Sequence, residues 1–282
     1  MTFTSGKLYQ TFKYSIYALL IFTVSFFFVE DFSSMSVTYK DGLELGDIIV
    51  AFTGSIDTFS WLILLLLLEL ETYIIPDDAI HGWVDWSLTS LTFLCGGVIL
   101  YAFYGYVETL YIPNGFSPQA GGAVCDLVGS GATFASSLDE YVPLDLKNCL
   151  LLANGAMYNE ALNMFSTPGG FSLLSQLVWL DVVNAGIWII VVIILELEVF
   201  LESSKLVGTR FFYIYKSFKL VLYGILVINI FYWWYLNEPV DALDAFLWLA
   251  AFFFIEMNML NWQEEVASSR AEAQKVGPAI QA

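Results

Sequence analysis

The chain has 282 residues, of which 58% are hydrophobic and 13% charged, and its net charge is −18. A soluble domain usually has about 25% charged residues, so this composition excludes an ordinary soluble domain and indicates a protein embedded in a bilayer. The ten Lys and Arg cannot neutralise a phosphate backbone, which excludes nucleic acid as a partner. A saline habitat would account for the acidity without any functional role.

Six segments are apolar enough to cross a membrane, since a spanning helix needs about 20 such residues. In chain order they cover residues 12–29, 56–75, 87–106, 177–201, 218–236 and 242–262. No small-residue cleavage site follows the first segment, so we expect it to be retained. We therefore expect an all-α integral membrane protein. Its parts are three spans in residues 1–108, an extracytoplasmic cap in 109–170, three spans in 171–262 and a cytoplasmic tail in 263–282.

The basic residues favour one orientation, because cytoplasmic loops carry an excess of Lys and Arg. With both termini inside, Lys40 and Lys147 face outside. The basic residues that then face the cytoplasm are Lys7, Lys13, Lys205, Arg210, Lys216, Lys219, Arg270 and Lys275. We therefore expect cytoplasmic termini and the location of a bacterial inner membrane protein.

The expected cap contains two cysteines, Cys125 and Cys149. Oxidising surroundings outside the cell permit a disulfide there, and we favour this pairing over two free thiols. The bridge would close a loop of about 25 residues, worth roughly 3 kcal/mol in the chain-entropy model. Gly and Ser in the first part of the cap predict turns. Residues 145–164 could form one or two short helices.

The second, fourth and sixth segments share the pattern (Asp or Asn)-x3-Trp-x7-Glu-x-(Glu or Asn). The three copies are Asp57, Trp61, Glu69 and Glu71; Asn184, Trp188, Glu196 and Glu198; and Asp244, Trp248, Glu256 and Asn258. All three patterned helices run in the same direction. They predict three pseudo-repeated helical hairpins related by an axis along the membrane normal, with the cap inserted in the middle one.

The repeated polar residues are candidates for an ion pathway, because an acid inside a bilayer normally faces protein or water. Glu69, Glu196 and Glu256 lie at one depth, where a ring of acids could concentrate cations or exchange protons. The alternative is structural. These residues lie about two turns from the inner ends of their spans, by helical geometry. They could reach the headgroups, bind a partner subunit or pair with a cation. The candidate cations are Lys205, Arg210, Lys216 and Lys219.

No other chemistry has a comparable pattern. His81 beside Asp77, Asp78 and Asp85 could hold a metal, but a solvated turn is the better interpretation, because zinc sites usually offer more His or Cys. The sequence lacks phosphate-loop, dinucleotide and hydrolase motifs, so we predict no cofactor. The leading hypothesis is a cation or proton channel or transporter. The second is a non-catalytic scaffold or accessory subunit, as a homo-oligomer or with other membrane proteins.

Overall fold

The computed structural model describes residues 2–38, 46–75, 81–119, 121–138, 140–202, 210–254 and 257. Among them, four helical segments are long and apolar enough to cross a membrane: Tyr9–Ser36, Trp83–Gly115, Pro168–Leu195 and Ile214–Leu236. They fall in helices α1 (Thr2–Thr38), α4 (Trp83–Thr109), α6 (Pro168–Glu202) and α7 (Arg210–Leu236). The mostly helical fold is therefore compatible with an integral membrane protein.

Two further helices coincide with the second and sixth expected segments. Helix α3 (Thr53–Glu69) has 17 residues and continues into a π-helical turn, η1 (Leu70–Ile74). Residues 239–254 form the other helix, and most of the remaining expected segment lies outside the described residues. Within the described residues, both helices are shorter than the four above. The count of six spans therefore stays a prediction.

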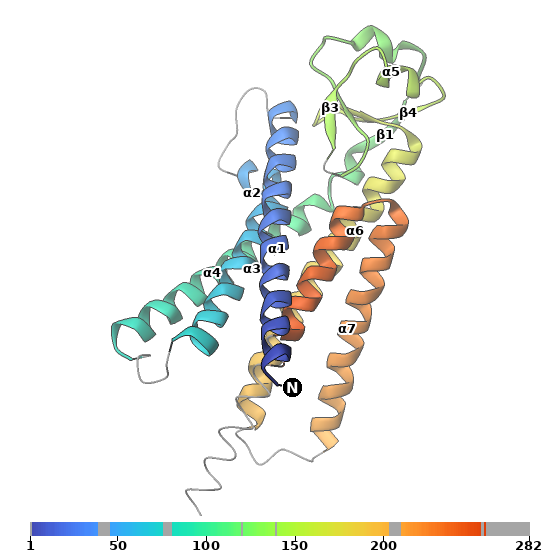
Figure 1. Cartoon of the computed structure of the whole chain (residues 1–282). Helices are drawn as coiled ribbons and strands as arrows, with labels where there is room; N and C mark the ends of the chain where they lie inside the picture. Colours follow the sequence, from blue (N-terminus) through green and yellow to red (C-terminus); the bar gives the residue numbers. More distant parts are fainter. Residues whose placement is uncertain are drawn as a thin grey trace, which may run out of the picture.

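Figure 1 shows α1, α6, α7 and the 239–254 helix running in roughly the same direction, while the hairpin of α3 and α4 crosses them obliquely and diverges at the end away from the cap. The N terminus lies at the end of the bundle opposite the cap. Helix α3 packs along α4 and also against α1, while α6 packs against both α4 and α7. Fully or nearly fully buried side chains join four of the helices: Leu20 of α1, Leu65 of α3, Val191 of α6 and Ala251 of the 239–254 helix. The main core of the molecule therefore lies between the helices, while many large apolar side chains face outward, as a lipid environment allows.

Local signals at the helix ends set the turns of the bundle. Pro168 begins α6, where its missing N–H costs nothing, and Thr167 accepts a hydrogen bond from the third residue of the helix at 3.0 Å. Helix α7 ends at Leu236, and the next residue, Asn237, takes the left-handed conformation with φ +67°. The N–H of Glu238 then donates to the carbonyl of Trp233 at 3.0 Å. This tight reversal lets the 239–254 helix return directly beside α7.

Gly105 brings α4 close to the short helix α2 (Asp47–Ala51), which precedes α3. A Cβ at this position would lie 2.6 Å from Thr53 Oγ1 and 3.2 Å from the carbonyl oxygen of Ile49. A larger residue would push α4 away from both helices, so the contact needs glycine. Gly97, on the same helix, has open space around it.

The cap contains a five-stranded sheet, so the expectation of an all-α chain is wrong for this region. The strands are β1 (Phe116–Gln119), β2 (Thr133–Ala135), β3 (Tyr141–Pro143), β4 (Ala156–Asn159) and β5 (Met164–Ser166). Their order is β1-β4-β5-β2-β3, with β2 and β5 parallel and the other neighbouring pairs antiparallel. Strands of three or four residues are too short for an alternating pattern to be recognised in sequence.

Residues 145–164, expected to hold one or two helices, contain the four-residue helix α5 (Asn148–Leu151) and strand β4. Asp145 precedes α5, and the backbone N–H groups of Asn148 and Lys147 donate to its carboxylate at 2.8 and 2.7 Å. These two donors lower the pKa of Asp145. A disulfide joins Cys125 to Cys149 with a Cα–Cα distance of 5.2 Å, and Cys149 is buried in the core of the cap.

Candidate cation-binding cavity

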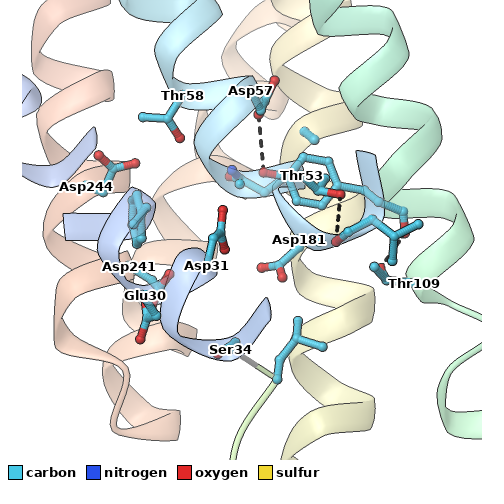
Figure 2. A pocket seen from close by; sticks show the side chains of 18 of the residues that line it. Glu30, Asp31, Ser34, Thr53, Asp57, Thr58, Thr109, Asp181, Asp241 and Asp244 are labelled. Carbon is cyan, nitrogen blue, oxygen red and sulfur yellow. Dashed lines mark hydrogen bonds between the residues drawn. The ribbon is translucent and has the colours of Figure 1, made fainter. Parts of the chain in front are cut away.

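A cavity of about 230 Å³ lies where α1, α3, α4, α6 and the 239–254 helix meet beneath the cap. The acids that line it are Glu30, Asp31, Asp57, Asp181, Asp241 and Asp244. Figure 2 shows these side chains entering the cavity region from several different helices. Within the described residues, no Lys, Arg or His lines this cavity. It therefore concentrates negative charge without a basic partner.

Neutral donors hold three of these carboxylates. Asp31 of α1 accepts hydrogen bonds from both the backbone N–H, at 3.1 Å, and the hydroxyl of Ser55. Asp57 of α3 accepts a hydrogen bond from the hydroxyl of Tyr106 at 3.3 Å. Asp244 accepts one from the hydroxyl of Thr23 at 2.6 Å. These contacts orient the carboxylates but do not cancel their charges.

Tryptophan indoles supply a second set of neutral donors. The indole N–H of Trp61 donates to Asp57, and that of Trp248 donates to Asp244, in each case from one turn further along the same helix. The spacing Asp-x3-Trp thus places a donor directly over the carboxylate. Asp181 of α6 receives an equivalent bond from an indole of α7. In the first and third repeats, the Trp therefore orients the Asp that precedes it.

Asp241 and Glu30 differ from the four other acids of the cavity, because within the described residues neither carboxylate accepts a hydrogen bond. The charged neighbours of Asp241 are all acids: Asp181, Glu238, Glu30 and Asp244. Glu30 likewise has only acids as charged neighbours, Asp31, Glu140 and Glu238. Asp241 has four such neighbours and Glu30 three, so Asp241 is the cavity acid with the most uncompensated negative charge around it.

Four aromatic side chains, called here the aromatic floor, close the cavity on the side away from the cap. Trp61, Trp188 and Trp248 surround Phe252, with ring centroids 6.0, 4.6 and 6.5 Å from the Phe252 centroid. All four also line the cavity and are at most 8% exposed. On the side of these rings that faces away from the cap, the buried apolar side chains of the main core fill the space between the helices. The aromatic floor therefore separates the acids from the end of the bundle near the N terminus.

The structure brings together the first halves of the three sequence repeats. Asp57, Asn184 and Asp244 all line the cavity, although they come from three different helices. Asn184 accepts a hydrogen bond from the side-chain amide of Asn229 at 3.4 Å. The three repeated Trp residues meet at the aromatic floor. The Asp/Asn and Trp positions of the pattern thus lie around one cavity, whereas the pseudo-repeat of whole hairpins stays a prediction.

The second halves of the repeats are not assembled in the described residues. Glu69 is buried, forms an ion pair with Lys13 and accepts a hydrogen bond from the hydroxyl of Tyr17 at 3.3 Å. Its partner lies on α1 and is none of the four cations considered from sequence. Glu71 lies in η1 and is partly buried. The remaining candidates, whose side chains or whole residues lie outside the described part, are Glu196, Glu198, Glu256 and Asn258.

Four cavity acids were missed as site candidates by sequence reasoning: Glu30, Asp31, Asp181 and Asp241. A signal for two of them was present. Asp181 precedes Asn184 by three residues, and Asp241 precedes Asp244 by the same spacing. Residues three and four apart share a helix face, so a longer pattern, Asp-x2-(Asp or Asn)-x3-Trp, marks the cavity face in two of the three repeats.

The cap covers the cavity and contacts the turn after α7. Leu138 and Tyr141 of the cap are among the lining residues, and the hydroxyl of Ser137 donates to Glu238 at 2.7 Å. Burial raises the pKa of Glu238; the Ser137 hydrogen bond opposes this shift, and the nearby Glu140 charge adds to it. This contact therefore joins cap and bundle through a titratable group.

The described residues contain no group of three or more His, Cys, Asp or Glu placed to hold a metal ion. Of the turn considered as a metal site, Asp77 and Asp78 lie outside the described residues, His81 precedes α4, and Asp85 lies in the first turn of α4. Comparisons of the chain with protein-family models, curated proteins and solved structures find no match.

Proposed function

We propose that this protein binds a cation in the cavity beneath the cap and carries cations or protons across the membrane. The observation that supports this most strongly is the set of six acids around one cavity without a lining base. Two unit charges about 8 Å apart repel by roughly 2 kcal/mol at an effective dielectric constant of about 20. Six ionised carboxylates in one cavity would therefore favour uptake of a cation or of protons.

The proposal includes six membrane spans. Helix α3 and η1 together run from Thr53 to Ile74 without interruption, which is 22 residues and matches the length of a span. The 239–254 helix begins on the cap side and runs antiparallel to α7 (Figure 1). The bias of basic residues then places the cap outside the cell and both termini inside. The three hairpins remain a proposed repeat, supported by the meeting of their Asp/Asn and Trp positions at the cavity.

In the described conformation the cavity is closed toward the inner side. The aromatic floor blocks it first, and the Lys13–Glu69 ion pair lies further along α1 and α3. Transport would thus require these layers to separate, as in alternating access between two sides of a membrane. The cavity acids bind the cation in this scheme, whereas Glu69 takes part in the closed inner layer.

Flux measurements in reconstituted liposomes test the proposal. Wild-type protein should pass protons or cations, inorganic or organic, and Asp244→Asn, which keeps a hydrogen-bond acceptor near Thr23 but removes a charge, should reduce the rate at least tenfold. The matched control is Asp126→Asn on the exposed surface of the cap, which should leave the rate unchanged. A wild-type protein whose liposomes leak no faster than empty ones would contradict the proposal.

A second candidate function, a scaffold subunit, is favoured by the exposed face of α4. Trp83 is 81% exposed, Phe93 78% and Trp86 69%, and this half of α4 packs mainly on α3 (Figure 1). Such a face can meet lipid or another membrane protein. A scaffold should co-purify with a stoichiometric partner, and Phe93→Ala should weaken that association without any flux effect.

A further inference from the structure

We propose, on the basis of the proposed function, that the cation held in the cavity is a small alkylammonium ion and not a bare metal ion. The walls of the cavity are as aromatic as they are acidic. Besides the four rings of the floor, the aromatic lining residues are Phe27, Tyr106, Tyr141 and Trp233. An organic cation uses both kinds of wall, because its charged nitrogen pairs with carboxylates while its carbon atoms pack on aromatic faces.

The carboxylates are distributed around the cavity instead of converging on a single point. Within the described residues no three acids approach one another closely enough to hold a metal directly. Three of the four aspartates that accept hydrogen bonds, Asp57, Asp181 and Asp244, each receive a Trp N–H. This bond occupies part of the capacity of the carboxylate to coordinate a metal. A metal with oxygen ligands needs about six such positions at short range. An ammonium group needs only one or two acceptors.

Asp241 provides the anchoring charge for the nitrogen. It lines the cavity, faces acids only and has no hydrogen-bond donor among the described residues. Asp241 is partly buried, and a carboxylate removed from bulk water without a partner is costly, so a cationic N–H donor would satisfy it. Asp181 and Asp244 are close enough to interact electrostatically with Asp241 and would share this nitrogen or hold a second one.

The size of the cavity agrees with this ligand class. Its volume of about 230 Å³ is several times the roughly 30 Å³ that one water occupies in the liquid. A bare alkali cation would fill little of that space. Water would have to fill the rest, although the aromatic rings of the floor offer it few hydrogen bonds. A short alkylamine or diamine would fill it and contact acids and rings together.

The experiment measures the thermal unfolding midpoint and the tryptophan fluorescence of the purified full-length protein in detergent. The added salts are 1,4-diaminobutane dihydrochloride, butylammonium chloride, sodium chloride and magnesium chloride at matched ionic strength. We expect the two organic cations to raise the midpoint and change the fluorescence saturably, and the two metal salts to have no saturable effect. Asp241→Asn should weaken the organic-cation response at least tenfold, and the exposed control Asp126→Asn should leave it unchanged.

The other outcomes overturn the inference in distinguishable ways. Saturable effects of sodium or magnesium without any effect of the organic cations would reject the alkylammonium assignment but keep a cation-binding cavity. No saturable effect of any salt on wild-type protein would reject both. An organic-cation response that persists in Asp241→Asn and in Trp248→Leu would place the ligand elsewhere on the protein. The exposed Trp179→Leu is the matched control for the second variant.

Discussion

The buried ion pair between Lys13 and Glu69 permits a quantitative prediction. The two side chains are 2% and 6% exposed, and the hydroxyl of Tyr17 also donates to the carboxylate. Removing one partner of such a pair leaves an uncompensated charge inside the protein and costs about 3–5 kcal/mol. Lys13→Met and Glu69→Gln should each lower the free energy of unfolding by that amount.

The double variant gives the sharper result. With both charges gone, Lys13→Met/Glu69→Gln leaves no buried ion, and the amide still accepts the Tyr17 hydrogen bond. We expect its stability to lie within about 1 kcal/mol of the wild-type value, since neutral replacements of buried pairs are often tolerated. Lys147→Met in the cap removes an exposed Lys and should change stability by less than about 0.5 kcal/mol.

Equilibrium unfolding in mixed micelles, followed by helical circular dichroism, measures these differences. A loss below about 1 kcal/mol for Lys13→Met would refute the reasoning, because that is the range of exposed ion pairs. It would show that water or headgroups reach Glu69, as in the interfacial placement considered from sequence. A double variant as unstable as the singles would mean that the side chains act by shape and not by charge.

Three other perturbations follow from the described contacts. Gly105→Ala should cost about 1–3 kcal/mol by overpacking α4 against α2 and α3, whereas Gly97→Ala in open space should be neutral or slightly stabilising in the same unfolding assay. Replacing Cys125 and Cys149 by Ser should destabilise the cap by about 3 kcal/mol, seen as faster proteolysis within it; an unchanged rate would contradict this. Since the pKa of Glu238 is raised, the folded state binds its proton more tightly, so its contribution to stability falls as pH rises from about 4.5. Glu238→Gln should flatten that decline in pH-dependent melting, and an unaltered pH profile would count against it.

The long apolar helices could be predicted because each span needs a hydrophobic run that composition alone reveals. The small sheet could not. Strand β5 pairs in parallel with β2 from 31 residues earlier, and both have three residues. A three-residue strand shows one alternation at most, and its pairing depends on tertiary contacts. The Gly- and Ser-rich composition of the cap correctly suggests turns but hides the strands between them.

The candidate site was predictable only where the sequence repeats itself. Asp57, Asn184 and Asp244 share a spacing to Trp, and the structure gathers them. Asp31 belongs to a helix without that pattern, and its place in the cavity depends on how α1 is rotated about its axis. The partner of Glu69 likewise depends on that rotation, because Lys13 is 56 residues away in the chain. Periodicity determines which residues share a face, but not which helix that face meets.

The central claim is that the cavity acids hold a cation, and carbodiimide labelling measures this directly. A membrane-permeant carbodiimide modifies carboxyl groups in apolar surroundings, and peptide mass spectrometry locates the modified residue. In cation-free buffer the peptide that contains Asp241 and Asp244 should be labelled, and a bound cation should protect it with a saturable dependence on concentration. If neither organic nor inorganic cations reduce the labelling of that peptide, the result contradicts the account.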